Sequence, residues 1–148
     1  AGGNNTPAFM AVSSAQQSCA HNTWIVIACP TEIYDSDSAY DTSTYKFTVP
    51  VGEQGVYVFS HTNGIQSMTS SAELIFGIAS NNAAGFGKSS SATSEGFASG
   101  TAYRVVTAVA NLDAGDEVWA TVVQGTGSTQ NTTNSAAFSG FKLIGSPF

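Results

Sequence analysis

Short runs of β-branched and aromatic residues, separated by turn-forming residues, recur along the whole chain and leave no stretch with helical periodicity. Glycine-containing turns are expected at 51–55 and 113–116. The pattern predicts an all-β sandwich or jelly roll. Its expected main strands are Ala8–Ser13, Trp24–Ala28, Tyr45–Val49, Val56–Ser60, Leu74–Ala79, Tyr103–Ala110, Glu117–Gln124 and Ala137–Ile144.

The Val56–Ser60 strand is apolar on both faces. Successive side chains of a strand point to opposite sides, so Tyr57 and Phe59 share one face and Val56 and Val58 share the other. A sheet with one face in water alternates apolar and polar residues instead.

The closing strand has the same character. Strict alternation places Phe141 and Leu143 on one face, and Phe138 and Ile144 on the other. A monomeric sandwich needs only one apolar face in each sheet. Strands that are apolar on both faces therefore predict a second burial event, and oligomerisation is the simplest one.

The composition excludes several classes of partner. Charged residues make up 9% of the chain and the formal net charge is −6, whereas an average soluble protein has about 25% charged residues. Four cations cannot provide the phosphate contacts of a nucleic-acid-binding protein or a polybasic membrane patch. No apolar run has the length needed to span a bilayer, so membrane insertion is not expected. The low charge favours a structural or extracellular protein over a cytosolic enzyme.

The two cysteines, Cys19 and Cys29, allow two interpretations. A disulfide between them would stabilise the fold by roughly 2–3 kcal/mol. Alternatively, both are free thiols buried as small apolar residues. The histidines, His21 and His61, do not combine with them into the spacing of a zinc site.

Asp35, Asp37 and Asp41 form the densest group of carboxylates in the chain. Calcium prefers several oxygen ligands from one loop, which makes these residues candidate Ca²⁺ ligands. A solvated acidic turn is the alternative. No cofactor is otherwise expected.

Two long polar segments, 81–100 and 125–135, are rich in small and hydroxyl-bearing residues. Long loops are commonly either solvated connections or recognition elements, and both interpretations stay open.

Several further motifs follow one another along the chain: Pro7-Ala8-Phe9-Met10-Ala11, Asp35, Tyr40, Lys46-Phe47-Thr48-Val49-Pro50, Gly55-Val56-Tyr57-Val58-Phe59, Leu112-Asp113-Ala114-Gly115-Asp116-Glu117-Val118-Trp119 and Phe138-Ser139-Gly140-Phe141-Lys142-Leu143. In this order and at this spacing they resemble the complement C1q globular-domain family, whose fold is shared with the tumour necrosis factor family. The resemblance extends from about residue 7 to residue 144. Two positions depart from the family pattern, because His61 replaces an aromatic residue and Cys29 replaces a phenylalanine.

The resemblance implies a jelly-roll β-sandwich of about ten strands that assembles as a trimer. Tyr57, Phe59, Trp119, Phe141 and Leu143 are then expected in the core or near the threefold axis. Members of this family are binding and assembly modules, so no catalytic residues are expected. The whole chain, 1–148, is expected to form one such domain.

The leading functional hypothesis is a non-enzymatic homotrimer exposed on a large assembly, such as the decoration or fibre-tip protein of a virion, most simply a phage particle. It rests on the low charge, the neutral polar loops and the absence of a collagen-like stalk in this sequence. Its partners would be copies of itself and other structural proteins. An extracellular domain that binds a receptor or a glycan is the alternative, and a jelly-roll hydrolase is a remote one.

Overall fold

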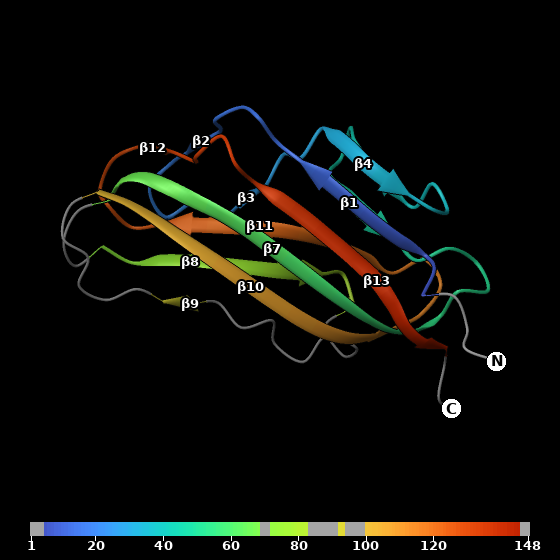
Figure 1. Cartoon of the computed structure of the whole chain (residues 1–148). Helices are drawn as coiled ribbons and strands as arrows, with labels where there is room; N and C mark the ends of the chain where they lie inside the picture. Colours follow the sequence, from blue (N-terminus) through green and yellow to red (C-terminus); the bar gives the residue numbers. More distant parts are fainter. Residues whose placement is uncertain (1–4, 69–71, 83–91, 94–99, 146–148) are drawn as a thin grey trace.

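The computed structural model describes residues 5–68, 72–82, 92–93 and 100–145. The described chain folds into two β-sheets that pack face to face as the two layers of a sandwich (Figure 1). It contains no helix, and hence none that could cross a membrane. The all-β prediction is confirmed, and the two packed sheets enclose the core as a jelly roll requires.

The first sheet, sheet I, has five antiparallel strands in the order β10-β7-β13-β1-β4. Neighbours in space are mostly distant in sequence, as in a jelly roll with crossing connections. The strands are β1 (Ala8–Val12), β4 (Thr31–Asp35), β7 (Gly55–Met68), β10 (Gly100–Leu112) and β13 (Ala137–Gly145).

The second sheet, sheet II, has the order β5-β6-β11-β8-β9, and β3 also pairs with β11. Its strands are β3 (Ile25–Val26), β5 (Tyr40–Asp41), β6 (Lys46–Thr48), β8 (Leu74–Ser80), β9 (Ala92–Thr93) and β11 (Glu117–Gln124). A separate ribbon joins β2 (Ser18–Cys19) to β12 (Gln130–Asn131).

Aromatic side chains fill the core between the sheets. The Phe9 ring stacks on Tyr40 and on Phe47, with 5.0 Å between ring centroids in both pairs. Phe59 and Phe138 are also buried and contact the same ring at 6.4 Å and 5.1 Å. Burying side chains of this size contributes about 1.5–3 kcal/mol each, so this cluster is a main source of stability.

The predicted turns are present where the sequence places them. At 51–55, the Glu53 N–H donates to the Pro50 carbonyl at 3.1 Å, and Gly52 adopts a φ of 85°. At 113–116, the Asp116 N–H donates to the Asp113 carbonyl at 3.1 Å, and Gly115 has a φ of 91°. Glycine is the residue that occupies this left-handed region without strain.

Each of the eight predicted strand runs overlaps a strand of the structure, but β7 and β10 are longer than expected. The longer of the two is β7. It continues through Asn63-Gly64, a pair that is typical of a turn, as far as Met68. Gly64 is required there for another reason: a Cβ on it would lie 2.8 Å from Tyr103 and from Thr133.

Candidate functional site

The outward side of sheet I is the main candidate functional surface. Along β7, Tyr57 and Phe59 point into the core and are fully buried. Their neighbours Val56 and Val58 therefore point outward, where both are half-buried. The strand is apolar on both faces, as the sequence predicts.

A row of apolar side chains crosses this surface from strand to strand. Val109 of β10 pairs with Val58 of β7, Val58 pairs with Phe141 of β13, and Phe141 pairs with Ala8 of β1. Val109 is 57% exposed and Phe141 is 39% exposed. Side chains at paired positions are within contact distance of each other, so the row is one continuous apolar strip.

The end of β13 extends this strip. A β-bulge between Lys142 and Ile144 brings Ile144 opposite Val56, which faces outward. Strict alternation placed Ile144 on the face of Phe138, and this prediction is wrong because the bulge changes the register. Ile144 is 51% exposed, and Leu143 beside it is exposed as well.

Strand β10 adds Tyr103 and Val105, which are exposed and share the outward parity of Val109. We call these outward-pointing residues of sheet I the apolar outer face. Its members are Val56, Val58, Tyr103, Val105, Val109, Phe141, Leu143 and Ile144. Monomeric soluble proteins rarely leave a contiguous apolar patch open to water, and such patches mark binding surfaces.

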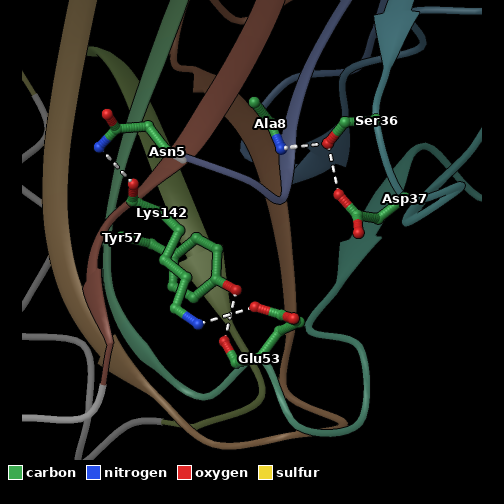
Figure 2. A network of polar contacts seen from close by, with 7 residues as sticks. All are labelled: Asn5, Ala8, Ser36, Asp37, Glu53, Tyr57 and Lys142. Carbon is green, nitrogen blue, oxygen red and sulfur yellow. Dashed lines mark hydrogen bonds and ion pairs between the residues drawn. The ribbon is translucent and has the colours of Figure 1, made fainter. Parts of the chain in front are cut away.

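A polar network fixes the inner side of β13 and thereby orients the apolar outer face (Figure 2). The Lys142 Nζ donates to Glu53 Oε2 at 2.8 Å, and the Tyr57 hydroxyl donates to the Glu53 carbonyl at 2.6 Å. Burial, with the nearby Glu53 charge, raises the pKa of Tyr57, so this hydroxyl keeps its proton. With Lys142 held inward, its neighbours Phe141 and Leu143 are left pointing to solvent.

The same view shows how the N-terminal segment joins sheet I (Figure 2). The Asn5 amide donates to the Lys142 carbonyl at 2.9 Å, and the Ala8 N–H donates to Ser36 Oγ at 2.9 Å. Ser36 in turn donates to Asp37. These contacts tie the start of β1 to β13 on one side and to the turn after β4 on the other.

The structure separates the five residues that the sequence groups together. Tyr57 and Phe59 lie in the core, while Phe141 and Leu143 lie on the apolar outer face. Trp119 is in neither place. It is half-buried on the outward side of sheet II, where the Lys46 Nζ lies 4.7 Å from the centroid of its ring.

Sequence reasoning missed the contribution of β10 to the apolar outer face. The run from Tyr103 to Ala110 carries the necessary pattern, because Val105 and Val109 alternate with Val106 and Ala108. Both faces of this strand are apolar, as in β7. The pairing of β10 with β7 is what places these residues on the same surface as Phe141.

Cys19 and Cys29 are both buried and both free, which is the free-thiol alternative of the sequence analysis. The structure therefore contains no disulfide between them. Burial raises the pKa of the Cys29 thiol to about 12 and that of Cys19 above its usual value. Both side chains are neutral at physiological pH and pack as small apolar groups.

Asp35, Asp37 and Asp41 accept hydrogen bonds from residues close to them in the sequence and do not converge on one point. Asp35 accepts hydrogen bonds from the N–H groups of Tyr40 and Asp37, at 2.8 Å and 3.3 Å. Asp41 accepts from the N–H and hydroxyl of Ser43, at 2.7 Å and 2.6 Å, and these bonds lower its pKa. No group of three His, Cys, Asp or Glu side chains that could hold a metal occurs within the described ranges.

Of the two polar segments, 125–135 is anchored to the sandwich. Within it, β12 pairs with β2, and the Thr132 N–H donates to the Gln17 carbonyl at 2.8 Å. Gly127 donates to His21 Nδ1 at 3.0 Å. Most of 81–100 lies outside the described residues, which include only 81–82, 92–93 and 100 of it.

Comparison with solved structures supports the fold. The globular domain of zebrafish complement 1qA protein aligns with a TM-score of 0.66 at 23% identity, covering 94% of this chain and 98% of that one. The Eiger tumour necrosis factor of S. frugiperda aligns with a TM-score of 0.59 at 12% identity, covering 95% and 94%. No curated protein matches the sequence.

At these identities the likeness shows a shared fold only. The sequence itself supplies the closer relationship, because the model of the C1q domain family matches residues 8–143. That range runs from β1 into β13 and includes all the residues on which the resemblance rests except Pro7. The chain therefore belongs to the C1q domain family.

Proposed function

We propose that the chain works as a homotrimer in which the apolar outer face of sheet I packs around a threefold axis. The observation that carries this proposal is the exposed row Val109–Val58–Phe141 on a sheet whose other face is already filled by the core. Domains of the C1q and tumour necrosis factor type commonly form homotrimers that bind receptors or ligands. Polar residues such as Ser60 and Ser139 lie between the apolar ones. They would keep the free chain soluble before this surface is buried in the trimer.

Within that trimer the chain acts as a binding or structural module and not as a catalyst. C1q-like domains are generally non-enzymatic. The titratable side chains of the described residues agree with this role, since His61 is sealed in the core and the aspartates cap their own turns.

The apolar outer face can be tested by hydroxyl-radical footprinting of the full chain. For each residue, the rate of modification in the folded protein is compared with the rate in the unfolded protein. We expect Phe141 and Tyr103 to be protected well beyond what their exposure in one chain allows, whereas Trp24 on sheet II stays reactive. Equal reactivity of Phe141 and Trp24 on this scale would refute the proposed interface.

The setting we propose for this trimer is the surface of a large assembly, with a phage or other virus particle as the leading candidate. The low charge and the neutral polar surface support an extracellular or particle-bound role, and proteins of this family are typically extracellular or secreted. Antibody labelling of purified particles, viewed by electron microscopy, tests the location. Particles without label, together with free protein in the surrounding medium, would favour an extracellular binding domain instead.

A further inference from the structure

A pocket on the outward side of sheet II contains both tryptophans of the chain. It has a volume of about 420 Å³, within the range of small-molecule sites. Its lining residues are Trp24, Ile75, Gly77, Ile78, Ala79, Trp119 and Thr121. Nothing in the proposed trimer uses this pocket, because its lining comes from β8, β11 and Trp24. Strands β8 and β11 belong to the layer opposite β7, β10 and β13 (Figure 1).

The pocket exists because small and large residues are paired across β8 and β11. Gly77 pairs with Thr121, and Ala79 pairs with Trp119. The small residues leave a depression, while Trp119 and Trp24 stand at its sides. Trp24 comes directly before β3, which pairs with β11 at Thr121, so this short strand brings the second indole to the same place.

Trp24 is 55% exposed, which is a large apolar surface to leave in water. Trp side chains combine an apolar ring with one N–H donor, and exposed examples are common at binding sites. Strand pairing brings the two indole rings together, although they are far apart in the sequence. The pocket is therefore formed by the fold and not by neighbouring residues of one segment.

A charged pair outside the pocket lining borders Trp119, one wall of the pocket, and limits the kind of ligand. The Lys46 Nζ lies 3.1 Å from Glu117 Oε2 and also lies over the Trp119 ring. The two charges neutralise each other, and the chain as a whole carries a formal charge of −6. An anionic ligand is disfavoured, whereas a neutral ligand with hydroxyl groups can donate to the carboxylate and accept from the ammonium group.

We propose that this pocket binds a neutral pyranose ring of a carbohydrate. A pyranose has an apolar C–H face, which suits an indole wall, and hydroxyl groups around its edge, which suit the Lys46–Glu117 pair. A proline-rich peptide fits less well, because proline has no N–H to donate to Glu117. This site differs from the polar segments 81–100 and 125–135 that the sequence analysis considered for recognition.

The chain contains no tryptophan other than Trp24 and Trp119, so its tryptophan fluorescence reports on this pocket alone. The probes are the methyl glycosides of glucose, galactose, mannose and N-acetylglucosamine, titrated into the full-length protein. We expect a saturable change in emission with at least one of them. Failure of all four to produce a saturable change, or saturation by a polyproline peptide alone, would overturn the carbohydrate proposal.

Two variants place the binding in the pocket. Trp24→Ala removes one wall, and Ala79→Leu fills the depression while keeping both indoles as reporters. Each should weaken binding at least tenfold, measured for Trp24→Ala by isothermal titration calorimetry with the glycoside that binds best. The matched control is Tyr34→Ala, which removes an exposed aromatic side chain from β4 in sheet I and should leave the affinity unchanged.

The melting temperature of each variant shows whether the sandwich is intact. Folded Trp24→Ala and Ala79→Leu proteins that both bind the glycoside as the parent does would overturn the assignment. This test does not depend on the oligomeric state. A monomer that binds a glycoside would refute the proposed trimer and leave the pocket proposal standing.

Discussion

Phe141 of β13 lies directly opposite Val58 of β7, and both side chains point away from the core of the sandwich. Val109 continues the row on β10. The inner side of the same strands is filled by Tyr57, Phe59 and their neighbours. Sheet I thus has two apolar faces, and a single chain buries only the inner one.

If the outer side is an interface, a charge at its centre should prevent assembly. Phe141→Asp places a carboxylate where the account puts a desolvated contact, at a cost of several kcal/mol for each copy. We expect this variant to be a folded monomer in size-exclusion chromatography with light scattering. Val51→Asp is the control, because Val51 is 95% exposed in the 51–55 turn. A Phe141→Asp protein with the same mass as the parent would contradict the proposed interface.

Gly140 shows why the Phe-Ser-Gly-Phe motif contains a glycine. A Cβ at this position would overlap the Phe59 ring and lie 3.0 Å from Phe9 Cε1, in the middle of the aromatic cluster. Overpacking a dense core is costly, so Gly140→Ala should lower the free energy of unfolding by about 3 kcal/mol.

The control for this substitution lies on the same strand. A Cβ on Gly145 meets nothing within 4 Å. Gly145→Ala should therefore change the stability little. Urea titration measures the unfolding midpoint of both variants. Equal midpoints for the two variants would show that the aromatic core is looser than the structure indicates.

His61 should make the protein sensitive to acid. The ring is 1% exposed, packs on Phe76 with 5.6 Å between centroids, and neither nitrogen has a hydrogen-bond partner of normal geometry among the described residues. Burial lowers its pKa to about 4 from 6.5. As the pH falls from about 6.5 to about 4, the unfolded chain takes up a proton that the folded chain does not. Stability is therefore lost over this range, by up to roughly 3 kcal/mol.

His61→Phe should remove this part of the pH dependence and raise the stability at neutral pH, since it replaces buried nitrogens that lack a hydrogen bond of normal geometry by an apolar ring. Chemical denaturation at pH 4.5 and pH 7.5 measures both effects. His21→Gln changes an exposed histidine and should keep the parent's acid dependence, because His61 is still present. If His61→Phe and the parent lost the same amount of stability between pH 7.5 and pH 4.5, another group would control the acid stability.

The thiols provide a direct test of the core around Cys19 and Cys29. Both are buried, neutral and free, and the thiolate is the reactive form. A thiol reagent such as dithionitrobenzoate should therefore react slowly with the native protein and should find two thiols per chain after unfolding in denaturant. Detection of no thiol after unfolding would mean that the cysteines form a disulfide.

Much of the fold follows from local sequence. The β-type runs and the glycine turns at 51–55 and 113–116 identify most of the strands and the reversals, because these features depend on side-chain alternation and on backbone conformation. The doubly apolar pattern of β7 also predicts a second buried surface, and Tyr57 and Phe59 lie in the core, one of the two expected locations.

Other features depend on which strands pair, and the sequence does not encode pairing locally. β4 (Thr31–Asp35) is exposed at the edge of sheet I and has no alternating pattern that would identify it. The bulge that turns Ile144 outward and the continuation of β7 through Gly64 arise from contacts with distant strands. The pocket between Trp24 and Trp119 likewise requires residues that are far apart in the chain.

The mass of the unmodified protein in solution tests the central claim most directly. Native mass spectrometry at micromolar concentration should give a single species of three times the chain mass of 15.2 kDa. A stable species of 15.2 kDa under these conditions would mean that water covers the row of Val109, Val58 and Phe141, and the proposed assembly would be wrong.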